Sequence, residues 1–431
     1  MTDRVLQKFD KKFVLRVLSG LFVAILISVV SITPANSQGV KIHFGETKIE
    51  NHFPDGLRFS VKIDVADQRG TIDFYYKLGN EPWAHQDARC SANGTVIDLD
   101  YYSCIFFLDI QNIPPQLPIT YKWRIYGSAQ RYSDEQTVHY ENPCYVWETF
   151  TRGNITIWWH DRPQEFAERV FLIAEKSIQE QQSLFEVNLS NPIHLVVENS
   201  REENSMWNSR IPYSIGGQAF PEVGVTIQIV ELDMSEFLVD SWLNEVVPHE
   251  ISHLYFFQAT NREHASPPNW LDEGLAGYNE FASHQFDWIL VKNAIRQDKL
   301  IPLADLRDAF SGDDDQVALS YSESMTAAEY LIETYGEQGL NDLFSAYQEG
   351  KTSEEAFQQA FGRTVSEVET DWEAWARAKP DEFSIGALIG IFFVGAYFAG
   401  GCASAFLLIG LILFLSRKKP MQKTVNGTAP G

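Results

Sequence analysis

Basic residues are scarce in this chain of 431 residues. It holds 34 Lys and Arg against 58 Asp and Glu, which gives a formal net charge of −24. Proteins that bind nucleic acid gather Lys and Arg to neutralise phosphates, so we expect no nucleic-acid partner. Cysteine is also rare, with four in the whole chain and no pair spaced as CxxC. A zinc site built from cysteine thiolates is therefore not expected.

The four cysteines differ in their surroundings. Cys90 and Cys104 lie close together and can form a disulfide in an oxidising compartment. Cys144 has no obvious partner, and Cys402 lies in a long apolar run.

Charge is absent from two stretches, 17–33 and 383–416, and each has basic residues on one side. Basic flanks lie in the cytoplasm by the positive-inside rule, so the acidic middle is expected outside it. We predict a signal peptide or uncleaved N-terminal anchor at 1–37, one transmembrane helix at 383–416, and a basic cytoplasmic tail at 417–431. The protein would then cross the membrane once, or twice if the first segment is uncleaved.

Residues 38–142 have the pattern of an antiparallel β-sandwich. Short alternating or β-branched runs recur between turn residues, which is typical of such a domain. We find no cluster of titratable side chains there, which leaves a spacer or a binding module as the interpretation. The predicted strands are 58–65, 71–77, 95–99, 105–110, 120–126 and 136–140.

Residues 143–382 have a mixed pattern in which strands are followed by helices, as in an α+β domain. Strands are predicted at 154–159, 192–198 and 224–230, and a helix at 163–184. A last helical block is predicted from 322 to 378, with helix ends at Gly336, Gly339, Gly350 and Gly362.

The segment His249-Glu250-Ile251-Ser252-His253 carries the chemistry. Residues four apart on a helix project from one face, so both imidazoles can reach one ion. Glu250 is then placed beside a water on that ion as a general base. HExxH occurs by chance in about one chain in a hundred of this length, so its surroundings must decide.

Those surroundings favour a catalytic zinc site. The motif lies in an apolar stretch, and a buried helix needs a reason to carry two His and a Glu. Pro267 and Pro268 can begin a second helix that brings Glu273 to the metal as third ligand. His264 is the weaker alternative, because it lies in a polar loop, and Asp272 points about 100° away from Glu273. The strand at 224–230 could pair with an extended substrate if it lies at an edge.

The stretch from Trp242 to Glu280 resembles the peptidase MA-like family, within the gluzincin group of zinc metallopeptidases. The pieces that carry this resemblance are VVPHEISHLYFFQAT, PPNWLDEGLAGYNE and SYSESMTAAEYLIETYGEQGL. The resemblance extends over about 145–378. It implies a zincin-like (thermolysin-like) domain with a mixed sheet and helices. It also implies His249, His253 and Glu273 as zinc ligands, with Glu250 as base and proton shuttle.

Pro248 departs from this pattern, since it directly precedes the first ligand. Its missing N–H suits a helix that begins only a turn earlier, or a kink.

A hydrogen-bond donor that stabilises the developing oxyanion is also expected, because gluzincins commonly use a Tyr or a His for it. Tyr321, predicted to open a helix, is the candidate, and Tyr278 is the weaker one. Ligand imidazoles usually donate their second N–H to a carboxylate. Glu245 and Glu280 both remain possible partners.

The sequence thus predicts a membrane-anchored zinc metallopeptidase. It would hydrolyse peptide or protein substrates outside the cytoplasm, with Glu250 assisting the attack of zinc-activated water. The alternative is a non-catalytic surface protein whose zinc is structural or absent. An intramembrane protease is disfavoured because Arg262, Glu263, Asp272 and Glu273 follow the motif closely.

Overall fold

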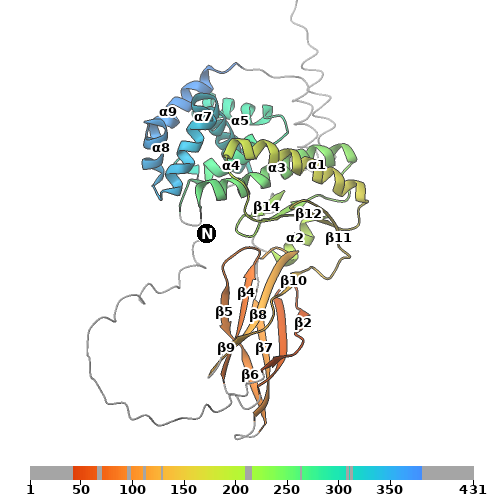
Figure 1. Cartoon of the computed structure of the whole chain (residues 1–431). Helices are drawn as coiled ribbons and strands as arrows, with labels where there is room; N and C mark the ends of the chain where they lie inside the picture. Colours follow the sequence, from red (N-terminus) through yellow and green to blue (C-terminus); the bar gives the residue numbers. More distant parts are fainter. Residues whose placement is uncertain are drawn as a thin grey trace, which may run out of the picture. The chain divides into compact units, whose positions relative to one another are not determined.

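The computed structural model describes residues 42–65, 70–94, 99–109, 113–127, 130–208, 216–262, 265–306, 310 and 314–380 (Figure 1). The hydrophobic segments predicted at 17–33 and 383–416 lie outside these residues, as do most of the strand predicted at 95–99, His264 and Cys402. None of the helices within the described ranges combines the length and the apolar composition needed to cross a membrane.

The N-terminal part of the described chain is two antiparallel sheets around one core. One sheet has the order β1-β3-β7-β6, with β2 on β3, and the other has the order β10-β8-β4-β5, with β9 on β8. Inward side chains alternate with outward ones, so that Phe59, Phe74 and Trp123 are buried together. The strands are β1 His43–Phe44, β2 Lys48–Asn51, β3 Gly56–Asp64, β4 Gly70–Leu78, β5 Ala84–Asp87, β6 Arg89–Gly94, β7 Leu99–Asp109, β8 Leu117–Gly127, β9 Gln130–Tyr132 and β10 Gln136–Tyr140.

Cys90 and Cys104 form a disulfide between the paired strands β6 and β7. Cys144 is exposed and has a free thiol.

The larger C-terminal part begins with a mixed five-stranded sheet, in the order β11-β12-β13-β15-β14. The strands β12, β13 and β15 are parallel, while β11 and β14 are antiparallel to their neighbours. Parallel strands are covered on both faces. The core shared with helices α1 and α3 lies on one face. A smaller core on the other face includes Leu117, the first residue of β8. The strands are β11 Glu148–Arg152, β12 Ile155–Trp159, β13 Ile193–Glu198, β14 Gly217–Phe220 and β15 Val225–Ile229.

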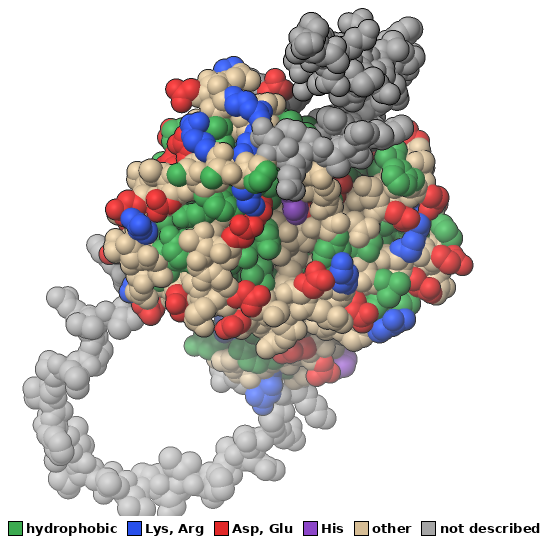
Figure 2. Space-filling view, turned by 90° about the horizontal axis from the view of Figure 1, so that it is seen from above, with side chains coloured by type: hydrophobic (Ala, Val, Ile, Leu, Met, Phe, Trp, Pro, Cys, Tyr) green, Lys and Arg blue, Asp and Glu red, His purple; other side chains and the backbone are tan. Residues whose placement is uncertain are grey.

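Helices follow the sheet and complete an α+β architecture. They pack largely on one another, since α4 and α7 share an extensive contact and α7 also contacts α5 and α8 (Figure 1). Asp and Glu side chains are spread over the visible face with Lys and Arg between them (Figure 2), in keeping with the acidic composition. The helices are α1 Gln164–Phe185, α2 Arg201–Trp207, α3 Glu236–Thr260, α4 Asn269–Tyr278, α5 Gln285–Gln297, α7 Asp314–Gln348, α8 Ser353–Phe361 and α9 Val365–Ala378.

Three expectations from the sequence were wrong. The strand predicted at 224–230 is not an edge, because β15 is hydrogen-bonded to β13 and β14 and is buried throughout. Tyr321 does not open a helix, since α7 begins at Asp314. Gly339 does not end a helix, whereas Gly336 interrupts α7 with a φ of 68° and Gly362 caps α8.

Candidate metal centre

Two helices bring the predicted ligands together. His249 and His253 lie on consecutive turns of α3, a helix capped by the Ser235 hydroxyl and buried along most of its length. Glu273 lies on the second turn of α4, which begins directly after Pro268. The three side chains offer ligand atoms that all lie within 4.8 Å of one another.

The spacing of these atoms fits a zinc ion. Glu273 Oε2 lies 3.5 Å from His249 Nε2 and 3.7 Å from His253 Nε2. Ligand atoms about 2.1 Å from a tetrahedral ion stand roughly 3.4 Å apart. Two imidazoles and a carboxylate, with one position left for water, also form the donor set of a catalytic zinc.

A carboxylate is hydrogen-bonded to Nδ1 of each imidazole, the ring nitrogen that faces away from the cluster. His249 Nδ1 lies 2.9 Å from Glu280 Oε1, and His253 Nδ1 lies 2.7 Å from Asp272 Oδ1. With the proton on Nδ1, each ring turns its Nε2 lone pair toward Glu273. Of the two partners that the sequence left open for a ligand His, Glu280 takes the role at His249.

Asp272 was not expected in this role. Its second oxygen accepts a short hydrogen bond from the Arg262 guanidinium, just beyond the end of α3. Asp272 is therefore fixed between Arg262 and His253. Nothing in the local sequence shows this, because Asp272 and His253 are 19 residues apart and meet only where α4 crosses α3.

The pKa values of the two imidazoles are shifted in opposite directions. Burial lowers the pKa of His253, so this ring is neutral and free to act as a ligand. Burial would also lower the pKa of His249, but the hydrogen bonds to Glu273 and Glu280 outweigh it and raise that pKa well above its usual value. Without an ion, His249 thus takes up a proton that a metal would displace.

Glu250 lies beside the cluster and is almost fully buried. Burial raises the pKa of its carboxyl to about 7, although the two imidazoles act against it. A carboxylate with such a pKa can accept a proton and return it near neutral pH.

A glycine on β14 makes room for Glu250. A Cβ on Gly217 would lie 2.6 Å from Glu250 Oε1 and 2.7 Å from Val246. The adjacent Gly216 similarly leaves space for the Trp242 ring, whose N–H donates to the Ile229 carbonyl. Together these glycines let β14, the edge strand of the described sheet, and the residue before it pass close to α3.

Pro248 lies well inside α3, because the helix begins at Glu236, about three turns earlier. Since proline has no N–H, the Asn244 carbonyl one turn before it loses its helical partner. The Phe281 N–H donates to that carbonyl over 2.8 Å. The proline thereby frees an acceptor that docks the segment carrying Glu280.

Of the two candidate tyrosines, only Tyr321 lies near the centre. Its ring centroid is 6.5 Å from that of His249. The Glu273 carboxylate, together with burial, raises the pKa of the Tyr321 hydroxyl, which therefore keeps its proton as a donor. The pKa of Tyr278 is raised by burial and by Glu329, a residue of α7, which places this side chain elsewhere.

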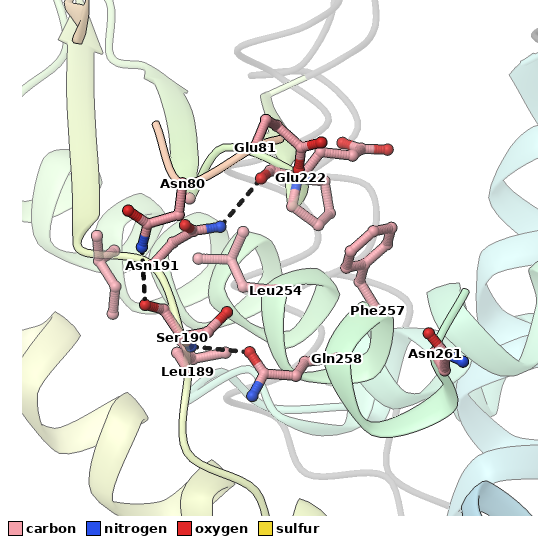
Figure 3. A pocket seen from close by; sticks show the side chains of 13 residues that line it. Asn80, Glu81, Leu189, Ser190, Asn191, Glu222, Leu254, Phe257, Gln258 and Asn261 are labelled. Carbon is pink, nitrogen blue, oxygen red and sulfur yellow. Dashed lines mark hydrogen bonds between the residues drawn. The ribbon is translucent and has the colours of Figure 1, made fainter. Parts of the chain in front are cut away.

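A cavity of about 200 Å³ lies at the C-terminal end of α3, and the ligand residues do not line it (Figure 3). Three hydrogen bonds cross it: Asn80 Nδ2 to the Ser190 carbonyl, the Ser190 N–H to Gln258, and Asn191 Nδ2 to the Glu222 carbonyl. The polar groups of this cavity thus join the turn after β4 to the segment before β13 and to α3. The cavity is separate from the metal centre.

One comparison with known proteins covers the residues of this centre. The family model described as the Peptidase MA superfamily matches residues 173–378. No curated protein is similar enough to the chain to count as a match.

Two solved structures are similar to parts of the chain. One is an aminopeptidase N family protein from Idiomarina loihiensis, 12% identical, covering 81% of this chain and 75% of its own, with a TM-score of 0.33. The other is a Br derivative of BhCBM56, 9% identical, covering 22% of this chain and 88% of its own, with a TM-score of 0.15.

The family match spans α3 and α4 and contains every residue of the His249, His253 and Glu273 cluster. Residues 173–378 of this chain are therefore similar to the Peptidase MA superfamily.

Proposed function

We propose that this protein is a zinc-dependent metallopeptidase anchored to a membrane, with its catalytic part outside the cytoplasm. In this proposal residues 38–142 form a β-sandwich domain and residues 143–382 the peptidase domain. The observation that carries it is the convergence of His249, His253 and Glu273 beside the buried Glu250. The basic ends and hydrophobic segments of the sequence support the membrane location.

The residues of the centre divide the chemistry among them. Zinc, when bound, lowers the pKa of a water molecule to about 7 and polarises a carbonyl oxygen. His249, His253 and Glu273 would hold the ion, with Glu280 and Asp272 orienting the two rings. Glu250 would take the proton of the attacking water and pass it to the leaving amine. The Tyr321 hydroxyl would donate to the developing oxyanion.

The substrate would bind as an extended chain along β14. This strand ends the described sheet and passes close to Glu250 at Gly217. A peptide added to such an edge gains main-chain hydrogen bonds, and its scissile carbonyl then lies next to the metal centre.

The test uses the full chain, purified in a non-ionic detergent without chelator. We expect about one zinc per chain by metal analysis, because one cluster of ligands is present among the described residues. Glu250→Gln should keep the zinc and lose about 10³-fold in kcat on a peptide library, the range for removal of a general base.

Tyr321→Phe serves as the matched variant, since it removes one hydroxyl and leaves the ligands in place. We expect kcat to fall about 10²-fold with KM nearly unchanged. Protein without zinc would contradict the metal assignment. Zinc-loaded wild type that cleaves no peptide would contradict the peptidase assignment and favour a surface module.

A further inference from the structure

The outer face of the second sandwich sheet carries a set of aromatic rings. Strand β8 buries Tyr121, Trp123 and Ile125, so its alternate residues point outward. Among these, Tyr126 is 57% exposed, and Tyr132 on the neighbouring β9 is 44% exposed. We call the outward rings of this face the aromatic platform: Tyr75, Trp83, Tyr126 and Tyr132.

Three cations lie over rings of the platform, and one of them is Lys77, whose Nζ lies 5.6 Å from the centroid of Trp83. Lys122 Nζ lies 4.0 Å from the centroid of Trp83 and 5.4 Å from that of Tyr132. The Arg124 guanidinium lies 4.8 Å from the centroid of Tyr75 and 5.7 Å from that of Tyr126. Rings fixed in this way lose little conformational freedom when a ligand stacks on them.

Carboxylates balance two of these cations. Arg124 forms a short ion pair with Asp73, and Lys122 Nζ lies 2.8 Å from Glu135 Oε1. Lys122 and Arg124, the two cations that each contact two rings, are therefore both paired with a carboxylate. The face thus combines flat rings with paired donors and acceptors. Such a face suits a neutral polar ligand better than an anion.

Aliphatic side chains do not contribute to this face. The Leu and Ile residues of β4 and β8 are buried in the cores, except Leu78, which is partly buried and packs against them, and β5 and β9 contain neither residue type. Protein interfaces combine aromatic anchors with apolar neighbours and are depleted in Lys. Sugar rings, in contrast, stack their C–H faces on aromatic rings and use their hydroxyls with charged and amide side chains.

We propose that the aromatic platform binds a neutral polysaccharide. The sandwich would then be a binding module that holds the peptidase half against a glycan-rich surface. This inference does not depend on peptidase activity, because the platform shares no residue with the metal centre.

Affinity electrophoresis of the full chain in non-ionic detergent tests the proposal. The native gels contain dextran, hydroxyethyl cellulose, laminarin or galactomannan, and a matched gel contains dextran sulfate. We expect at least one neutral polysaccharide to retard the wild type. Tyr126→Ala and Tyr132→Ala should each weaken that binding about tenfold, the loss expected for one stacked ring.

Phe107→Ala provides the control, since Phe107 is 45% exposed on β7 of the other sheet. This variant should bind as the wild type does. Migration unretarded by every neutral polysaccharide, or retardation by dextran sulfate alone, would overturn the proposal. Retardation unaffected by both tyrosine variants would also overturn it, and capture of a protein through Tyr126 would assign the platform to a protein partner.

Discussion

Glu198, at the end of β13, is a buried carboxyl outside the metal centre. It is inaccessible to solvent and accepts hydrogen bonds from Trp207 Nε1 at 2.7 Å and Asn204 Nδ2 at 2.8 Å. Burial, with a contribution from the nearby Glu203, raises its pKa from 4.5 to about 8. Between these two values the folded protein keeps a proton that the unfolded chain releases.

Folding stability should therefore fall as the pH rises through this window. The contribution of Glu198 to the free energy of unfolding is fully present below the pKa of its carboxyl in the unfolded chain. It is lost as the pH rises through the pKa of that carboxyl in the folded protein. Between about pH 6 and about pH 8, the free energy of unfolding should fall in both proteins or in the wild type alone. We expect this fall to be about 2 kcal/mol smaller in Glu198→Gln than in the wild type. Urea unfolding at several pH values measures this difference.

The exposed Glu180 offers a matched control, because Glu180→Gln should follow the pH profile of the wild type. Parallel profiles for wild type and Glu198→Gln would show that Glu198 is ionised in the folded protein.

At this scale the sequence predicts the residues of the cluster better than their supports. His249, Glu250 and His253 can be found because a helix fixes their spacing, and Glu273 because a second helix begins directly after Pro268. Asp272 and Gly217 could not be assigned. Their roles depend on how separate elements cross, which no local pattern determines.

Within α3, one residue couples a helix defect to the geometry of the metal centre. Proline inside a helix costs about 3 kcal/mol relative to alanine. In this helix Pro248 also leaves the Asn244 carbonyl to the Phe281 N–H, which fixes the neighbouring Glu280 beside His249.

Pro248→Ala should therefore separate stability from metal affinity. The restored N–H competes for the Asn244 carbonyl, so the melting temperature should stay constant or rise. Zinc affinity should fall about tenfold, because Glu280 is less firmly placed. Calorimetry and chelator competition measure the two quantities.

Pro163→Ala is the matched control, since Pro163 precedes α1 and touches no ligand. A drop of melting temperature and zinc affinity together would indicate general damage. Unchanged zinc affinity would show that Pro248 does not position Glu280.

The sequence predicts long, regular elements and misses short ones. Alternation in β3, β4 and β8 and the pattern of α1 correspond closely to the predicted ranges. The prediction missed strands of two to six residues each, several of them with little apolar character, namely β1, β2, β5, β6, β9, β11 and β14. Such strands form because a neighbour offers an edge, so their own residues carry no strong signal.

For the molecule as a whole, a zinc ion would join α3 to α4, because its ligands come from both helices. Removal of the ion should therefore lower the melting temperature. Zinc at 100 times its Kd contributes about 2.7 kcal/mol, which corresponds to roughly 5–10 °C. Calorimetry with and without 1,10-phenanthroline measures this shift.

His249→Ala tests whether the effect arises at this centre, because the variant lacks a ligand. It should melt at the same temperature with and without the chelator. An equal shift in the variant and the wild type would place the stabilising metal elsewhere.

The architecture of the whole chain was predictable in part. The order of a β-rich segment followed by an α+β segment follows from hydrophobic periodicity, and the described structure has this order. The packing of one sheet face against residues near Leu117 cannot be predicted from that periodicity. It depends on the shapes of two surfaces that are far apart in the sequence.

Strand β14 ends the described sheet, which has a consequence for handling the protein. An edge strand can pair with an extended chain, including another copy of itself. Lys or Pro would protect such an edge, yet both would obstruct the peptide that we propose to lie there. The strand has only four residues, which limits how many hydrogen bonds an unwanted neighbour can form. We therefore expect self-association to depend on protein concentration and to be suppressed by peptides that occupy the edge.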